Sequence, residues 1–294
     1  MHISLDSALG QLRLLNSFGE SITQIAPNPA AAYSLRSLTG GDPRAVRVRR
    51  SSDGDETDFT TSEISSGKLA AHIGSGNDGF VSIWYDQSGS DNATSGTPAY
   101  QPKIVNSGTL LEDANGNPYL EFDGTNDFFS VSKTTFNNAS YGYVSSVAQY
   151  DDASAANEPV YYASTADTGT ETRALLGKIS SGGAKFAAAG RRLDTDTFRS
   201  SLETADTDKN LFAGLFQWTA GSMQLFLNGV AKTAGTYSSG SGNTSATNAN
   251  SAFIGRLGSS YYGGKMYEMI IYNTDQSGNR EALETNMTNE YNIT

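Results

Sequence analysis

Short runs of alternating or continuous apolar residues, separated by Gly, Ser, Asn and Asp, dominate this chain of 294 residues. Strand-like runs occupy residues 141–150, 160–163, 173–179, 185–189, 210–218, 223–227, 252–256 and 265–272. Runs of this length, bounded by turn residues, are typical of β-strands. No long helical pattern interrupts them, so they predict a mostly β, antiparallel sandwich rather than a parallel sheet with crossover helices.

Two segments have helical spacing instead. Near the start, Ser4 is a suitable N-cap and Gly19 a suitable residue after the C-terminus, and the apolar face consists of Leu5, Leu9, Leu12 and Leu15 with Ala8. At the other end, Leu283, Met287 and Tyr291 recur every four residues. We therefore predict an N-terminal helical arm and connector at residues 1–30, a sandwich domain at residues 31–294, and a short C-terminal helix packed on it. The four leucines of the arm are predicted assembly contacts.

The run FVSIWYDQSGSDN at residues 80–92 passes from an apolar strand directly into a polar turn. Such a turn can be a binding loop, or a hairpin corner in which Asx side chains bond to their own backbone. We favour the corner for Asp86 and Gln87, because these residue types dominate ordinary turns. Trp84 lies within the apolar strand and is predicted to belong to the core. A second turn, at residues 123–126, is predicted to join strands at residues 119–122 and 127–131.

A basic cluster precedes an acidic one. The arginines are Arg44, Arg47, Arg49 and Arg50, and the carboxylates that follow are Asp53, Asp55, Glu56 and Asp58. Opposite charges this close in sequence are expected to pair locally, with little effect on stability where the pairs are exposed. We favour this interpretation over an anion-binding site.

Five blocks of sequence, in this order, resemble a known module: AYSLR (residues 32–36), AVRVRRSSDGDETDF (45–59), FVSIWYDQSGSDNAT (80–94), QPKIV (101–105) and LEFDGTNDFF (120–129). They are similar to the front half of domains like the catalytic domain of α-L-arabinofuranosidase B, also met in concanavalin A-like and laminin-G-like proteins. The resemblance covers residues 31–131 and implies a two-sheet jelly-roll sandwich. The segments at residues 211–230, 252–256 and 261–273 look like closing strands of a laminin-G-like sandwich. Modules of this kind also resemble parts of virion proteins of environmental bacteriophages.

Composition removes several classes of function. Without cysteine, the chain has no disulfide framework, thiolate metal site or cysteine nucleophile. A net charge of −11 argues against binding nucleic acid or an anionic membrane surface. The histidines are His2 and His72, and no GxSxG motif accompanies His72 as a triad member. No apolar run approaches the roughly 20 residues that span a bilayer.

Carbohydrate binding requires aromatic platforms and planar hydrogen-bonding groups. The glycan-binding candidates are Tyr85, Asp86, Gln87, Asn92, Tyr261 and Tyr262, with Trp84 and Tyr100 as further aromatics. A glycoside hydrolase needs two carboxyl groups across the scissile bond, which Asp86, Glu121, Asp123 or Asp127 could supply from strand ends. In the resembling family the catalytic pair lies in the later part of the domain, where no motif matches. We therefore assign no catalytic residue.

The resemblance and the N-terminal arm lead us to predict a bacteriophage virion structural protein: a fibre, decoration or tail component. It is expected to be homo-oligomeric, with other virion subunits or its own copies as partners and with loops that contact host-surface polysaccharide. Because the start has no basic segment before a hydrophobic core, we expect synthesis in the host cytoplasm and location in the virion. An arabinofuranosidase-like glycoside hydrolase is the alternative. No cofactor is expected; a Ca²⁺ ion held by loop carboxylates and carbonyls would suit a lectin-like sandwich, but no EF-hand-like spacing supports one.

Overall fold

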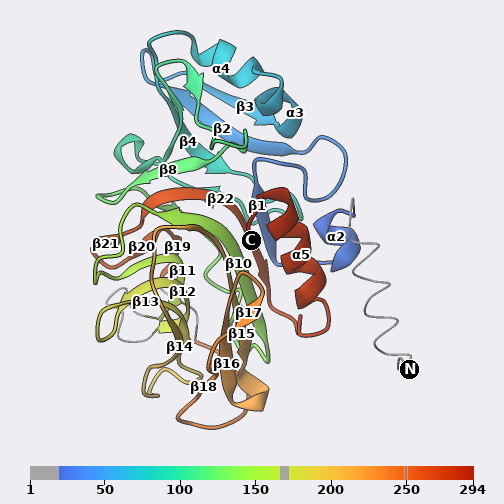
Figure 1. The fold of residues 1–294 in the computed structure, drawn as a ribbon, viewed down its shortest axis with the longest axis vertical. Coiled ribbons are helices and arrows are strands. Elements are labelled where there is room, and N and C mark those ends of the chain that lie inside the picture. The colour runs from blue at the N-terminus through green and yellow to red at the C-terminus, as the bar shows by residue number, and fades with distance from the viewer. Residues whose placement is uncertain (1–19, 166–171, 248, 250) are drawn as a thin grey trace.

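The computed structural model describes residues 20–165, 172–247, 249 and 251–294 (Figure 1). The predicted arm helix, with Leu5, Leu9, Leu12 and Leu15, lies outside the described residues. In the described part, strands dominate and all named pairings are antiparallel. The predicted mostly β sandwich is confirmed.

Sheet I is built around the last long strand, β22 (Gly263–Tyr272). From β22 the order continues through β10 (Gly142–Tyr150), β15 (Lys209–Gln217) and β16 (Ser222–Leu227), and β16 pairs with β17 (Val230–Ala231) and β18 (Gly235–Thr236). On its other edge, β22 pairs with both β1 (Ala31–Ser34) and β8 (Leu120–Asp123). The start and the end of the domain therefore meet in one sheet.

Sheet II packs against sheet I. Its order is β9 (Phe129–Ser130), β19 (Ser251–Ile254), β11 (Glu158–Ser164), β12 (Thr172–Ser180), β13 (Ala184–Gly190) and β14 (Arg199–Thr204). A short hairpin, β20 (Arg256–Leu257) and β21 (Ser260–Tyr261), follows β19. The ring centres of Phe186 in β13 and Phe212 in β15 are 4.7 Å apart, in an edge-on contact that joins the two sheets.

An upper unit at residues 44–110 stands above the sandwich in Figure 1. It contains β2 (Arg44–Arg50), β3 (Glu56–Thr60), β4 (Gly79–Trp84), β5 (Ala93–Thr94), η1 (Pro98–Tyr100), β6 (Lys103–Asn106) and β7 (Thr109–Leu110). Two short helices, α3 (Thr61–Ser65) and α4 (Lys68–Ile73), accompany the strands and were not predicted. Because β6 pairs with β8 of sheet I while β5 pairs with β9 of sheet II, the unit connects both sheets.

The predicted hairpin around residues 123–126 is wrong in its pairing. The turn exists, since Asp123 Oδ1 accepts hydrogen bonds from the backbone N–H groups of Thr125 (2.8 Å) and Asn126 (3.1 Å). The strands on either side do not pair with each other, because β8 joins sheet I and β9 joins sheet II. A turn motif read locally could not reveal that its flanks bond to strands more than 100 residues away.

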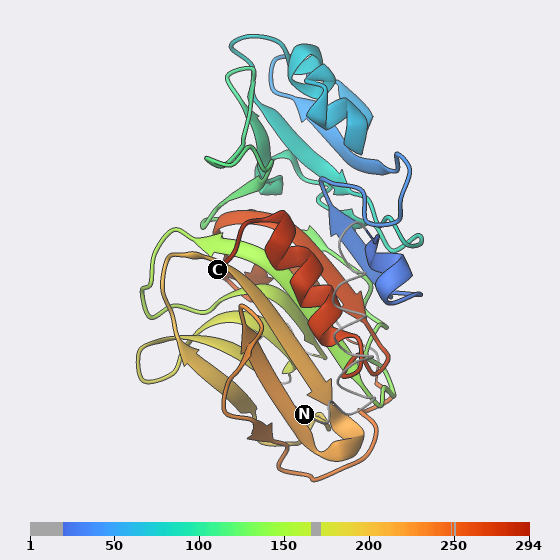
Figure 2. The ribbon, with the colours of Figure 1, turned by 45° about the vertical axis from the view of Figure 1, so that its right-hand side comes forward.

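Apolar burial follows the predicted pattern. One core cluster runs between the sheets and into the upper unit, and it includes Trp84, which is fully buried as predicted. A second cluster lies on the opposite face of sheet I, where α2 (Ile22–Ile25) and α5 (Arg280–Glu290) cover the strands. Figure 2 shows α5 lying along this face. Leu283, Met287 and Tyr291 supply its buried stripe, so the predicted C-terminal helix is confirmed.

Candidate functional site

The polar turn after β4 is organised by Asp86, which is 6% exposed. Its Oδ1 accepts hydrogen bonds from the backbone N–H groups of Ala32 and Ser88, both at 2.9 Å, and from the Ser88 hydroxyl at 2.7 Å. Its Oδ2 accepts from the backbone N–H of Asp91 at 3.2 Å. The Asn92 Oδ1 in turn accepts from the Asp86 backbone N–H at 3.1 Å. Asp86 and Asn92 therefore hold the strand-end turn to itself and to β1.

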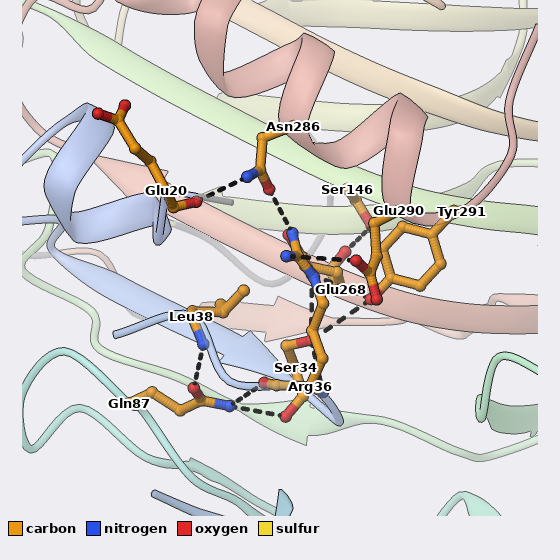
Figure 3. A network of polar contacts seen from close by, with 10 residues as sticks. All are labelled: Glu20, Ser34, Arg36, Leu38, Gln87, Ser146, Glu268, Asn286, Glu290 and Tyr291. Carbon is orange, nitrogen blue, oxygen red and sulfur yellow. Dashed lines mark hydrogen bonds and ion pairs between the residues drawn. The ribbon is translucent and has the colours of Figure 1, made fainter. Parts of the chain in front are cut away.

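Gln87 connects the same turn to the segment that follows β1. Its Nε2 donates to the carbonyl oxygens of Ser34 (3.0 Å) and Arg36 (2.8 Å), and its Oε1 accepts from the Leu38 N–H (2.8 Å), as Figure 3 shows. The side-chain amide thus satisfies three backbone groups where no strand lies alongside to do so.

Figure 3 also shows a buried ionic network beside Gln87. Glu268 of β22 is fully buried, and its carboxylate accepts from Arg36 Nε at 2.7 Å and Nη2 at 3.0 Å. The hydroxyls of Tyr291 (3.0 Å) and Ser34 (3.1 Å) complete its shell. Since Arg36 also donates to Asn286 of α5 at 2.7 Å, the network joins β22, α5 and the segment that follows β1.

The tyrosine candidates lie in different settings. Tyr85 is 7% exposed, and its hydroxyl donates to Asp58 Oδ1 at 2.6 Å. Tyr262 is fully buried, and its hydroxyl donates toward the carbonyl oxygens of Gln149 and Lys265 at 2.8 Å each. Tyr261 is partly exposed and belongs to the hairpin of β20 and β21. None of these three tyrosines lines the carboxylate-rich pocket described next.

Three of the four carboxylates considered for catalysis do come together. Glu121, Asp123 and Asp127 line one cavity of about 580 Å³, to which the structure adds Asp151. Glu121 and Asp123 alternate in β8 with Leu120 and Phe122, which belong to the core, so both carboxylates point away from it. We name the cavity the acidic pocket. Its remaining walls are Phe80, Pro98, Ala99, Gln101, Lys103, Phe122 and Asn126.

Sequence reasoning missed Asp151 and Lys103. Asp151 directly follows β10, so it occupies the same strand-end position that singled out the other three carboxylates. Lys103 begins β6 and forms an ion pair with Asp78 at 3.0 Å, with its ammonium 5.6 Å from the ring centre of Phe80. The position at a strand end could have identified Asp151 as a candidate. Nothing local in the sequence indicates that Lys103 lines the acidic pocket.

Asp127 is the most perturbed carboxyl of the pocket. It is 7% exposed, and its Oδ2 accepts a hydrogen bond from the Asp123 backbone N–H at 3.0 Å. Burial, together with the nearby charges of Asp123 and Glu121, raises the pKa of the Asp127 carboxyl to about 7. Asp127 is therefore largely protonated below neutral pH, where it can donate a hydrogen bond as well as accept one.

The pocket combines groups that suit hydroxyl-rich ligands. Exposed carboxylates accept hydrogen bonds, and the Asn126 Oδ1 is buried without a hydrogen-bond partner among the described residues. Phe80 and Pro98 contribute apolar surface. Within the described residues, no three His, Asp or Glu side chains are arranged to hold a metal ion, and no helix is long and apolar enough to cross a membrane.

No protein-family model and no curated protein sequence matches the chain. Solved structures do match. An arabinofuranosidase complexed with arabinofuranosyl-α-1,2-xylobiose aligns with 90% of this chain and 64% of its own, at a TM-score of 0.56 and 14% identity. A GH54 α-L-arabinofuranosidase soaked with a cyclic sulfate inhibitor aligns with 90% of this chain and 65% of its own, at a TM-score of 0.56 and 12% identity. The CBM40 module of Ruminococcus gnavus IT-sialidase, bound to α2,3-sialyllactose, aligns with 57% of this chain and 95% of its own, at a TM-score of 0.44 and 16% identity.

The chain thus has a β-sandwich fold like that of the two arabinofuranosidases, which agrees with the resemblance found in its sequence blocks. It spans less than two thirds of the length of those enzymes. At identities of 12–14%, the likeness to these two enzymes shows a shared fold and does not extend to function.

Proposed function

We propose that this protein binds a neutral carbohydrate in the acidic pocket. The observation that carries the proposal is the convergence of Glu121, Asp123, Asp127 and Asp151 on one cavity of about 580 Å³ beside an aromatic wall. Carboxylates accept hydrogen bonds from sugar hydroxyls, and apolar walls fit the apolar faces of sugar rings. Four carboxyl groups beside one lysine disfavour anionic glycans, because like charges repel in a partly enclosed site. The fold shared with two arabinofuranosidases supports the carbohydrate class.

The binding test uses Asp151→Ala. Asp151 is exposed and its side chain forms no hydrogen bond or ion pair with the part of the chain that the structure describes, so its removal should leave the fold intact. A hydrogen bond to a charged group contributes about 1.5–3 kcal/mol, so the affinity for a neutral oligosaccharide found on a glycan array should fall about tenfold or more. Glu112→Ala, which removes an exposed carboxylate outside this pocket, is the matched control. Equal binding by wild type and both variants would refute the pocket as the site.

A glycoside hydrolase is the alternative function, and Asp127 favours it. A carboxyl with a pKa of about 7 is suited to general acid work, and Glu121, Asp123 and Asp151 are available as a base or nucleophile. The test is turnover of 4-nitrophenyl α-L-arabinofuranoside. Hydrolysis should be present below about pH 7 and decline above it as Asp127 loses its proton, and Asp127→Asn should abolish it. No turnover by the wild-type protein would leave binding alone.

We also propose that the protein performs this binding as a structural component of a bacteriophage virion. Its support is the resemblance of the AYSLR, VRRSSD and WYDQSG blocks to virion modules, and the leucine spacing at residues 5–15. Removal of residues 1–19, which keeps the buried α2 in the chain, should prevent assembly into the oligomer or particle, as measured by analytical ultracentrifugation. Assembly that is unchanged by this deletion would exclude the arm as the docking element.

A further inference from the structure

Aromatic side chains gather on the outer side of sheet II, close to the acidic pocket. The Phe128 ring centre lies 5.3 Å from that of Tyr100 and 6.3 Å from that of Tyr261, with both neighbours tilted relative to it. We call these three residues the aromatic platform. Behind them, Phe253 meets Phe128 edge-on at 5.3 Å, as expected for aromatic pairs in a packed cluster.

The platform and the acidic pocket share two backbone segments. Tyr100 lies between Ala99 and Gln101 in the chain, and Phe128 directly follows Asp127. Ala99, Gln101 and Asp127 all line the pocket. The backbone N–H of Phe128 donates to the carbonyl oxygen of Tyr100 at 3.1 Å, which joins the two segments. Tyr100 and Phe128 of the platform are therefore chain neighbours of residues that line the pocket, so the platform lies beside it.

Arg256 supports the platform by lying over the rings of Phe128 and Tyr261, and part of the surface of each platform residue remains exposed. The Arg256 guanidinium lies 4.8 Å from the ring centre of Phe128, 4.7 Å from that of Phe253 and 6.0 Å from that of Tyr261. Tyr100 is 38% exposed, and among the described residues it and Val230 are the large hydrophobic side chains that reach such exposure. Phe128 and Tyr261 are partly exposed as well. Exposed and preorganised rings of this kind are typical of a binding surface.

We infer that the ligand is a chain of several neutral sugar rings, which runs from the acidic pocket onto the aromatic platform. This inference rests on the proposed function and specifies its ligand as an oligosaccharide or polysaccharide rather than a single sugar. Rings beyond the pocket stack on Tyr100, Phe128 and Tyr261, while hydroxyls of the rings inside it bond to the carboxylates. The adjoining negative charge selects neutral chains over anionic polymers that could also stack on aromatic rings.

The experiment measures affinity against chain length by isothermal titration calorimetry. The probes are neutral arabino-oligosaccharides and xylo-oligosaccharides of one to six rings, with oligogalacturonides as anionic chains of the same lengths. For the wild-type protein, affinity for neutral chains should rise about tenfold or more between two and five rings. Tyr100→Ala should remove about 3–10-fold of that gain, the range expected for one aromatic contact, and leave the affinity for two rings unchanged.

Two further variants separate stacking from general surface effects. Tyr100→Phe retains the ring and should keep the dependence on chain length. Val230→Ala removes the other exposed apolar side chain, which lies in β17 of sheet I, and should bind like the wild type.

Three results would overturn the inference. If wild type binds short and long neutral chains equally and Tyr100→Ala changes nothing, the ligand does not reach the platform, although the proposed function stands. If no neutral chain of any length binds, the proposed function fails and the inference fails with it. If Tyr100→Ala instead changes the sedimentation coefficient and not the binding of sugar, the platform is a contact between copies of the chain.

Discussion

The charged side chains of this protein fall into two physically different groups. Pairs formed between neighbours in sequence, such as Arg47 with Asp58 at 2.7 Å and Arg50 with Asp53 at 2.8 Å, confirm the predicted local pairing and lie partly in solvent. Arg49 is the exception, since its Nε donates to Gln101 Oε1 at 2.7 Å instead. The Arg36–Glu268 pair joins residues 232 positions apart, and its carboxylate is fully buried. No local pattern predicts such a pair, because it depends on β1 lying beside β22.

At this scale we predict a large difference between two arginine variants. Arg36→Ala leaves the Glu268 carboxylate buried without its counter-charge, so the free energy of unfolding should fall by about 3–5 kcal/mol. Arg44→Ala removes an arginine whose side chain is 61% exposed and paired with Asp58, and should cost about 0–1 kcal/mol. Urea denaturation measures both. Similar losses for the two variants would contradict the assignment of Arg36 as a structural residue.

The C-terminal helix α5 shows what periodicity predicts about an element and what it omits. Leu283, Met287 and Tyr291 pack on sheet I as their spacing indicates. Between them, Glu284 is also buried, with Arg280 Nη1 at 2.5 Å and the Tyr143 hydroxyl at 3.4 Å. Burial raises the pKa of the Glu284 carboxyl to about 7 in spite of Arg280. A charged residue type on the apolar face is invisible to a search for apolar repeats.

For this element we predict a pH-dependent stability. The folded state retains the Glu284 proton up to about pH 7, while the unfolded chain loses it near its ordinary value of 4.5. The contribution of this group is therefore fully present below about pH 4.5 and is lost as the pH rises to about 7, a change of about 3 kcal/mol.

The matched variant is Glu284→Gln, which has no proton to lose. Measured by urea denaturation from pH 4.5 to pH 8, its stability relative to wild type should rise by about 3 kcal/mol. Glu281→Gln, on the same helix with a side chain that is 71% exposed, should follow the wild-type profile. Parallel profiles for wild type and Glu284→Gln would show that Glu284 does not titrate in this range.

At the scale of the whole molecule, the upper unit and the sandwich share one apolar core. The ring centre of Trp84 lies 5.6 Å from that of Tyr33 and 6.2 Å from that of Phe129. The ring centre of Trp218 lies 5.7 Å from that of Phe216 and 5.4 Å from that of Phe136. All six aromatic residues belong to the same buried cluster. Since the strands of the upper unit also bond to both sheets, the parts should not unfold independently.

We therefore predict a single cooperative unfolding transition for the described domain. Trp84→Phe and Trp218→Phe each leave one tryptophan, which reports from the upper unit or from the sandwich. In each variant, the urea midpoint from tryptophan fluorescence should equal the midpoint from far-ultraviolet circular dichroism. A fluorescence midpoint that differs from the circular dichroism midpoint in either variant would divide the domain into separately folding parts.

The sequence by itself determined most of the long strands, although not β14, and it determined the turn after β4, the buried Trp84 and the C-terminal helix. These features depend on residue types within a few positions of each other, so period and turn chemistry are sufficient to find them. The sequence also identified Glu121, Asp123 and Asp127 as strand-end carboxylates. Only the tertiary structure placed them in one pocket with Asp151, because β8 and β9, adjacent in the chain, pair with strands in different sheets. Burial, which raises the pKa of Asp127, likewise exists only in the folded chain.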